Sequence, residues 1–300
     1  MVFPASSLLN LKSLSISQIQ NIFLMAKKIK DESLPVLDSG KTIALLFFEP
    51  STRTRMSFET AAYRVGLRPI LLEGVAGTSL EKGETVKDTI LNVAAMAPRF
   101  LVIRCNDETD LEQISKQVDF PILNAGWGKI GHPTQALLDA FTMLENFDGN
   151  LKGKRLLIVG DSRHSRVVAS HLELLPQLGV EVEFAGPEEY LPIGRKSRIQ
   201  SLDTDLADFD AVMCLRFQFE RHKNTEIFSK ENYRETWGLN LSRALKMKPS
   251  ALIMHPGPIN QGIELEPEVL NDKRCVVLEQ VRNGVCIRES LLRLMLGEAL

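Results

Sequence analysis

Short apolar runs alternate with segments of helical period along most of the chain, and this alternation limits the fold to one class. The runs are almost continuously apolar, as parallel strands are when both faces of their sheet are covered. Between the runs, apolar residues recur at i, i+3, i+4 and i+7, for example from Phe58 to Val65, which gives each helix one apolar stripe. The sequence therefore predicts an α/β fold with doubly wound parallel sheets. The expected strands are 41–48, 68–73, 100–104, 155–160, 180–186, 211–216 and 251–255.

Two domains are expected, because a polar, glycine-bearing segment at 148–155 separates two stretches of this pattern. It follows an expected helix at about 133–147 and precedes a new strand, which is a common place for one sheet to end and another to begin. The length of 300 residues is sufficient for two cores. The last helix carries a stripe that includes Ile287 and Leu291, and its pattern leaves open which domain it joins.

Composition and charge exclude several classes of function. With 36 basic and 38 acidic residues interleaved, the chain has no basic face for nucleic acid. No apolar run reaches the roughly 18 residues that cross a bilayer, and the first residues lack the pattern of a secretory signal. We therefore expect a cytoplasmic protein with no membrane partner. The cysteines form no C-x-x-C pair, so we expect neither a zinc site nor disulfides; they are Cys105, Cys214, Cys275 and Cys286.

The stretch 48–59, "FEPSTRTRMSFE", places hydroxyl and guanidinium groups where an apolar strand ends and a helix begins. The first turn of a helix has backbone N–H groups without partners and partial positive charge, so it attracts anions. The segment from Ser51 to Thr54 also follows the carboxyl end of a strand, where open α/β sheets bind ligands. A phosphate group fits this position. The alternative is an ordinary Ser/Thr N-cap flanked by surface arginines.

The two arginines of this stretch cannot serve one ligand together. Arg53 and Arg55 are two residues apart, which separates them by roughly 200° around a helix. We assign Arg53 to the ligand and Arg55 to a structural ion pair.

The same stretch resembles the carbamoyl-phosphate signature of the carbamoyltransferase family, F-x-x-x-S-x-R-T-R. The resemblance implies that the segment from Ser51 to Thr54 binds carbamoyl phosphate through Ser51, Thr52, Arg53 and Thr54. A second stretch, "SLEKGET" at 79–85, is similar to the mobile loop of the family. Its serine and lysine, matching Ser79 and Lys82, reach the active site of a neighbouring subunit.

Two later stretches extend the resemblance. In "LVIRC" the strand ends in Arg104, which matches the family arginine that contacts phosphate and the carbamoyl oxygen. In "HPTQALLD", His132 matches the histidine that donates to the carbonyl oxygen, and Gln135 matches the glutamine on the carbamoyl amide. Trp127 departs from the small or acidic residue usual in the family.

The second half of the chain resembles the part of the family that binds the amino acid. Arg166 matches an arginine for the α-carboxylate, and Arg216 and Gln218 match residues that hold the side-chain carboxylate. Backbone carbonyls matching Gly257 and Pro258 receive N–H groups, and Lys82 contributes here too. Two guanidinium forks suit two carboxylates and would repel the ammonium group of ornithine, so aspartate is the expected acceptor.

The resemblance covers nearly the whole chain and implies an activity. Carbamoyl phosphate and L-aspartate would give N-carbamoyl-L-aspartate and phosphate, a step of pyrimidine synthesis, without metal or organic cofactor. The implied domains are 1–132 plus 286–300 for carbamoyl phosphate and 133–285 for aspartate, joined by interdomain helices. The implied catalytic residues are Arg53, Thr54, Arg104 and His132.

The implied assembly is a homotrimer with active sites shared between subunits. Whether regulatory chains or a dihydroorotase associate with it is left open. The alternatives are a carbamoyltransferase with another amine acceptor and a non-catalytic scaffold of the same family. A generic phosphate-binding module would leave Arg166 and Arg216 unexplained.

Overall fold

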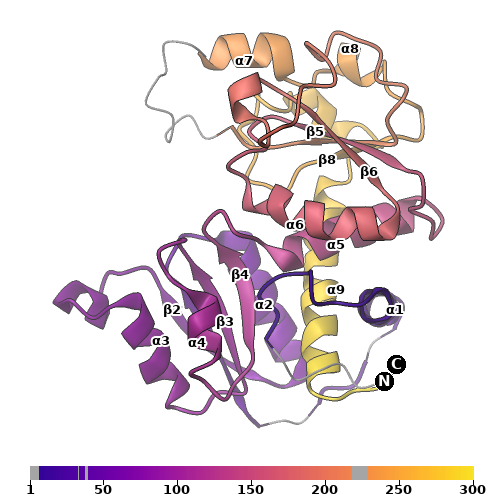
Figure 1. Cartoon of the computed structure of the whole chain (residues 1–300). Helices are drawn as coiled ribbons and strands as arrows, with labels where there is room; N and C mark the ends of the chain where they lie inside the picture. Colours follow the sequence, from indigo (N-terminus) through magenta and orange to yellow (C-terminus); the bar gives the residue numbers. More distant parts are fainter. Residues whose placement is uncertain (1–6, 33, 38–39, 218–228) are drawn as a thin grey trace. The chain divides into compact units, whose positions relative to one another are not determined.

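The computed structural model describes residues 7–32, 34–37, 40–217 and 229–300, and shows two compact units (Figure 1). The first unit comprises Met1–Phe141, Ala169–Leu174 and Val281–Leu300, and the second Thr142–Val168 and Leu175–Gln280. Each unit contains one four-stranded parallel sheet flanked by helices, which confirms the predicted fold class. Within the described chain, every helix is too short or too polar to cross a lipid bilayer.

In the first unit the strand order is β2-β1-β3-β4. The chain moves from β1 outward to β2 and then returns past β1 to β3, so right-handed crossovers place α2 on one face of the sheet and α3 on the other. The carboxyl ends of β1 and β3 therefore flank the topological switch point. The strands are β1 (Thr42–Phe47), β2 (Arg68–Glu73), β3 (Phe100–Cys105) and β4 (Ile122–Trp127). The helices that begin in this unit are α1 (Ile16–Asp31), α2 (Thr52–Val65), η1 (Ser79–Lys82), α3 (Val86–Ala94), α4 (Leu111–Ser115) and α5 (Pro133–Asn146).

The second unit repeats this topology with the order β6-β5-β7-β8, so its switch point lies between β5 and β7. The strands are β5 (Arg155–Val159), β6 (Glu181–Ala185), β7 (Ala211–Cys214) and β8 (Leu252–Met254). The helices that begin in this unit are α6 (Arg166–Leu174), η2 (Leu175–Leu178), η3 (Glu188–Tyr190), α7 (Lys230–Trp237), α8 (Leu241–Ala244), η5 (Pro267–Asn271) and α9 (Val277–Met295).

Each strand expected from the sequence is present, with ends that differ by at most about two residues, as is usual for such assignments. The expected helix at 133–147 is α5. The sequence pattern misses β4, because Asn124 and Gly126 interrupt its apolar run. Asn124 is fully buried in the strand, where its amide donates to the Leu9 carbonyl and its oxygen accepts from the Gly126 N–H.

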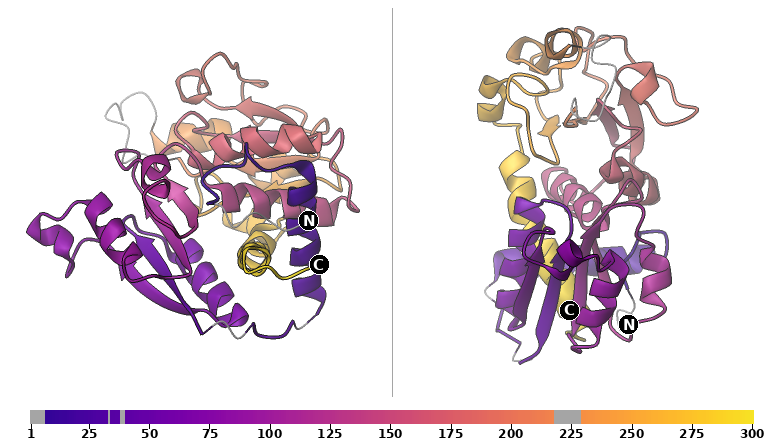
Figure 2. Two further views of the ribbon diagram at one scale, coloured as in Figure 1. Left: turned by 60° about the horizontal axis from the view of Figure 1, so that its bottom comes forward. Right: turned by 90° about the vertical axis from the view of Figure 1, so that its left-hand side faces the viewer.

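Helices α5, α6 and α9 each contribute residues to both units. In the first unit, α9 lies beside α1 (Figure 2), and the Ser290 hydroxyl donates to the Ile22 carbonyl over 2.8 Å. The expected division into substrate domains, 1–132 plus 286–300 and 133–285, stays a prediction, because it is defined by what each part binds.

Trp127, which departs from the family pattern, is accommodated in the core of the first unit. The side chain is 5% exposed and belongs to an apolar cluster with Cys105 and Leu111. The following turn is tight, because the Gly128 N–H bonds to the Cys105 carbonyl and a Cβ at Gly128 would overlap Asp107. The large side chain of Trp127, the last residue of β4, is therefore part of the apolar core of the first unit.

Gly66 ends α2 with a φ of +86°, and a Cβ there would overlap the Leu37 carbonyl oxygen and approach Val36 Cγ1 to 2.9 Å. We expect Gly66→Ala to lower the free energy of unfolding of the first unit by about 3 kcal/mol, from left-handed strain plus steric overlap. The change in free energy is measured by tryptophan fluorescence during urea unfolding. A Trp237→Phe background is used, because the remaining tryptophan, Trp127, lies in the first unit and reports on that unit alone.

The matched control is Gly297→Ala, which follows α9 at a φ of +92° with no atom near its Cβ position. The free energy of unfolding of this variant should fall by only about 1 kcal/mol, because left-handed strain is its sole cost. Equal losses for the two variants would contradict the steric argument.

Candidate active site

The N-terminus of α2 has the properties of an anion site. β1 ends at Phe47 and α2 begins at Thr52, so the first turn lies at the carboxyl end of a central strand. Ser51 occupies the N-cap position in extended conformation, and its side chain forms no capping hydrogen bond. No acidic residue lies in the first turn. The backbone N–H groups and the hydroxyls of Ser51 and Thr52 are thus placed to receive an anion.

The two arginines of α2 have different surroundings. Arg55 Nη1 lies 3.5 Å from Glu73 Oε2 on β2, which confirms its assignment to a structural ion pair. Arg53 lies on a different side of α2 and is an exposed residue. Partial desolvation nevertheless lowers the pKa of its guanidinium from the ordinary value. Arginine stays protonated at neutral pH in spite of such a shift. Arg53 therefore supplies a positive charge at the start of α2.

Arg104 lies at the same edge of the sheet, because β1 and β3 pair with Phe47 opposite Arg104. Its Nε is 3.8 Å from Glu49 Oε2, and its Nη1 donates to the Ala125 carbonyl over 3.5 Å. The guanidinium is thereby held at the switch point between β1 and β3.

The first turn of α5 meets the first turn of α2. Thr54 Oγ1 and His132 Nε2 are 3.4 Å apart, and both side chains are buried. The His132 backbone N–H donates to Ser170 Oγ over 2.9 Å, and its carbonyl accepts from the Gln135 N–H. The structure therefore brings together Thr54 and His132, two residues that are far apart in the sequence.

Ser79 and Lys82 form the two ends of the short helix η1, and both are exposed. Among the described residues, no side-chain contact joins either of them to the other predicted site residues of the same chain. Their assignment to the site of a neighbouring subunit stays a prediction.

In the second unit, the predicted aspartate ligands follow the central strands. Arg166 begins α6 after β5, and Arg216 follows β7, so both lie at the switch point of that sheet and both are half-buried. The Gly257–Pro258 peptide is cis, and the Gly257 N–H donates to His255 Nδ1 over 2.8 Å. Gln218 lies outside the described residues.

Comparison with known proteins decides the family. Residues 6–145 match the model "Aspartate/ornithine carbamoyltransferase, carbamoyl-P binding domain", and residues 152–295 match the Asp/Orn binding domain of the same family. The chain belongs to the aspartate/ornithine carbamoyltransferase family. The resemblance inferred from the motifs is thereby confirmed.

Individual members of the carbamoyltransferase family match over nearly their full length. The aspartate carbamoyltransferase catalytic subunit of Campylobacter lari is 40% identical over 292 residues, 97% of this chain and 99% of the relative. That of Aliarcobacter butzleri is 43% identical over 277 residues, 92% and 93% of the two chains. Aspartate transcarbamoylase from Trypanosoma cruzi, solved with carbamoyl phosphate, matches with a TM-score of 0.87 at 27% identity and covers 96% of this chain and 95% of its own.

Sequence reasoning missed a buried arginine in this member of the carbamoyltransferase family. Arg288 on α9 donates to Thr134 Oγ1 over 3.2 Å, and its guanidinium lies 5.2 Å from the centre of the Phe58 ring. Burial lowers its pKa to about 9, the charge of Asp139 opposes the shift, and the charge of Arg104 adds to it. A second guanidinium thus accompanies Arg104. The only signal was a run of polar residues within the apolar pattern of α9.

Glu264 was also missed, and it organises the second unit around Arg216. Its carboxylate accepts from the Phe217 N–H over 2.9 Å, and from both the backbone and the side-chain N–H groups of Asn260 over 2.7 Å. It therefore ties the segment after β7 to the loop after Pro258. Burial raises the pKa of Glu264, although these hydrogen bonds act in the opposite direction.

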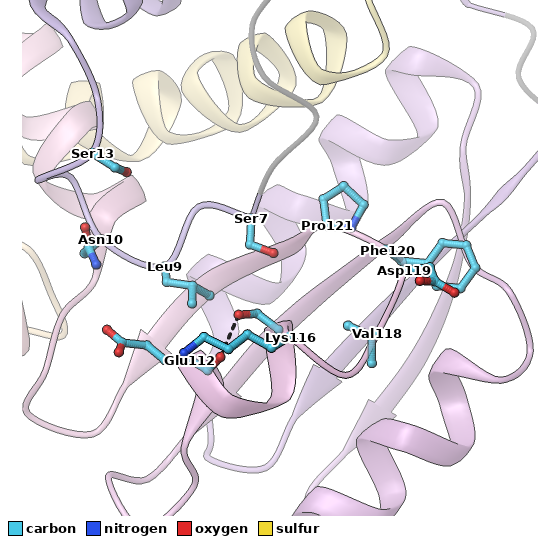
Figure 3. A pocket seen from close by; sticks show the side chains of 11 residues that line it. Ser7, Leu9, Asn10, Ser13, Glu112, Lys116, Val118, Asp119, Phe120 and Pro121 are labelled. Atoms are coloured by element: carbon cyan, nitrogen blue, oxygen red, sulfur yellow. Dashed lines mark hydrogen bonds between the residues drawn. The ribbon is translucent and has the colours of Figure 1, made fainter.

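A cavity of about 490 Å³ lies elsewhere in the first unit, between the N-terminal segment and α4 (Figure 3). Its lining mixes the charged side chains of Glu112, Lys116 and Asp119 with apolar ones. None of the predicted substrate-binding residues lines it.

The raised pKa of Glu264 predicts how stability depends on pH. A carboxyl group with a raised folded-state pKa contributes stability that is complete below its ordinary pKa and is lost as the pH rises through the folded value. We therefore expect the free energy of unfolding of the wild type, relative to Glu264→Gln, to fall as the pH rises above the ordinary pKa of a glutamate, about 4.3. Urea unfolding in a Trp127→Phe background measures it through Trp237, which lies in the second unit.

The glutamine does not titrate, so any constant packing difference cancels from the pH dependence. A stability difference that grows with pH would mean that the hydrogen bonds outweigh burial.

Proposed function

We propose that this protein is an aspartate carbamoyltransferase, which converts carbamoyl phosphate and L-aspartate to N-carbamoyl-L-aspartate and phosphate in pyrimidine synthesis. The observation that carries the choice of aspartate is the position of Arg166 and Arg216 beside the two central strands of the second sheet. Each guanidinium can bind one carboxylate in bidentate fashion. The names of the relatives at about 40% identity support the same choice.

In this proposal the first unit binds carbamoyl phosphate. The first turn of α2 and Arg104 receive the phosphate, Arg53 neutralises it as it departs, and Gln135 contacts the carbamoyl amide. Thr54, Arg104 and His132 donate to the carbonyl oxygen and stabilise the oxyanion of the tetrahedral intermediate. The 3.4 Å contact between Thr54 and His132 supports their joint action on one oxygen. Removal of one such donor typically raises the barrier by ~2.7–4 kcal/mol.

The second unit binds aspartate. Arg166 holds the α-carboxylate, Arg216 and Gln218 hold the side-chain carboxylate, and the Gly257 and Pro258 carbonyls receive N–H groups. The amine forms a C–N bond to the carbonyl carbon, the C–O bond to phosphate breaks, and the leaving phosphate accepts the amine proton. The proposed chemistry needs neither a metal nor an organic cofactor, because fixed positive groups meet the developing charge.

The assignment of Arg166 predicts a defect confined to aspartate. We expect Arg166→Ala to raise KM for aspartate at least about 30-fold, because it leaves a carboxylate without its partner, and to leave KM for carbamoyl phosphate unchanged. Steady-state assays of the released phosphate measure both constants. Arg163→Ala is the matched control, since Arg163 is exposed on the same loop.

The same assay with ornithine tests the acceptor. Faster carbamoylation of ornithine than of aspartate would reject the proposed substrate. Binding of carbamoyl phosphate without turnover of either amino acid would instead favour a non-catalytic scaffold.

We also propose a homotrimer in which Ser79 and Lys82 complete the site of a neighbouring subunit. β2 is an edge strand of the first sheet, and Ile70 and Leu71 on it are 52% and 40% exposed. An exposed apolar edge strand favours aggregation unless another chain covers it. The segment after this edge leads directly to η1, so a copy that covers β2 would receive Ser79 and Lys82.

The shared site predicts complementation between inactive chains. Arg53→Ala and Lys82→Ala should each be nearly inactive alone, because each removes charge from every site of its trimer. Mixed trimers contain some sites with both residues intact, so mixing after mild dissociation should restore part of the activity. Light scattering establishes the size and an activity assay follows recovery. Hybrid trimers without recovered activity would reject sharing between subunits.

The proposed compartment is the cytoplasm. All four cysteines are free thiols, as is usual in reducing compartments, and none is fully exposed. Free thiols therefore support the proposal of a cytoplasmic enzyme.

A further inference from the structure

A buried chain of polar side chains joins Gln135 to helix α6. Gln135 Nε2 donates to Asp139 Oδ1 over 3.0 Å, and Asp139 Oδ2 lies 2.9 Å from His171 Nε2. Asp139 and His171 are fully buried, and Gln135 is 8% exposed. All three residues belong to the first unit. Sequence reasoning assigned a role only to Gln135.

This chain determines which end of the Gln135 carboxamide faces a ligand. A carboxylate only accepts hydrogen bonds, so Asp139 draws the amide nitrogen of Gln135 towards itself. The amide oxygen then points the other way, and the described residues supply no partner for it. Gln135 is thereby fixed as a hydrogen-bond acceptor towards the site.

His171 restrains Asp139 from the opposite side. Its Nε2 must carry the proton that it shares with the carboxylate, and this bond prevents rotation of Asp139 away from Gln135. The charge of Arg288 also acts on Asp139, so the buried carboxylate has a positive group near it. Both carboxylate oxygens of Asp139 are thereby engaged, one by Gln135 and one by His171, while His171 Nδ1 has no hydrogen-bond partner among the described residues.

We propose that Asp139, held by His171, orients Gln135 so that the site selects a carbamoyl group over an acetyl group. This inference rests on the proposed function, in which Gln135 contacts the carbamoyl amide. The NH₂ of carbamoyl phosphate donates to the fixed amide oxygen. The methyl group of acetyl phosphate cannot donate, so its binding leaves that oxygen without a partner. Asp139 and His171 are positioning residues that act through Gln135.

The test compares the affinities of the trimeric enzyme for carbamoyl phosphate and acetyl phosphate, measured by calorimetry or as inhibition constants. Asp139→Leu removes the acceptor and frees the carboxamide to turn, although leucine is the larger side chain at this buried position. The ratio of the two affinities should fall about tenfold, the factor expected for one hydrogen bond to a buried group. An unchanged ratio would overturn the proposal. Ser290→Ala is the control, because it removes a buried hydrogen bond of the same unit away from the site.

A second pair of variants keeps the test decisive if Asp139→Leu folds poorly. His171→Gln retains an N–H donor near the position of Nε2, whereas His171→Met has a similar volume and no donor. We expect the methionine to lower the affinity ratio about threefold and the glutamine to preserve it. Equal effects of the two would show a packing role for His171 and contradict the proposal.

A double-mutant cycle establishes the route of the effect. Gln135→Ala should itself abolish the discrimination, and adding His171→Met should then change the ratio no further. Additive effects would mean that His171 acts independently of Gln135, contrary to the inference.

Failure of the inference is distinguishable from failure of the proposed function. A wild-type protein that binds no carbamoyl phosphate would reject the function. The side-chain amide resonance of Gln135, identified by its loss in Gln135→Ala, tests the restraint without any substrate. Slow hydrogen exchange of this amide in the wild type and faster exchange in His171→Met support the inference, and equal exchange rates overturn it.

Discussion

The site depends on one constraint of parallel sheets, namely that strand order reverses next to the first strand of each unit. The reversal leaves the carboxyl ends of β1 and β3 without a covering crossover, and those of β5 and β7 likewise. Helix N-termini lie at the same edges, because α2 and α4 in the first unit and α6 in the second begin a few residues after a central strand. Backbone N–H groups, partial positive charge and arginines at strand ends therefore accumulate there without any special local fold. A small anion is a natural ligand of each such edge.

In the proposed reaction, fixed positive charge takes the place of reactive side chains. Arg104 is held by Glu49 and by the carbonyl of Ala125, while Arg288 is buried against an aromatic ring. Holding these groups in place before a ligand arrives costs folding free energy, since burial disfavours the charged form. Because these groups are already in place, they need little reorganisation when charge develops on a reacting oxygen. Stability and the proposed catalysis thus make opposite demands on Arg104.

The sequence predicts the fold class, the strands with continuous apolar runs and the residues that carry family motifs. It fails for β4, because Asn124 is satisfied by tertiary hydrogen bonds that no local pattern reveals. The sequence predicts site residues where a strand ends or has just ended, as at Arg53, Arg104 and Arg166, and their roles stay predictions. Asp139, His171, Glu264 and Arg288 were missed for a common reason. Each lies inside a helix or loop and contacts a residue far away in the chain, so only the folded structure places it.

The C-terminal helix has a consequence for how the molecule is made. Residues 281–300 belong to the unit that the first half of the chain builds, and Arg288 and Arg293 bond there to Thr134 and to the Pro35 carbonyl. The ribosome therefore releases nearly the whole polypeptide before this unit can close. Until then its N-terminal sheet lacks one supporting helix. Premature termination even a few turns from the end would leave the first unit unfinished, although every residue of the signature at 48–59 had already been synthesised.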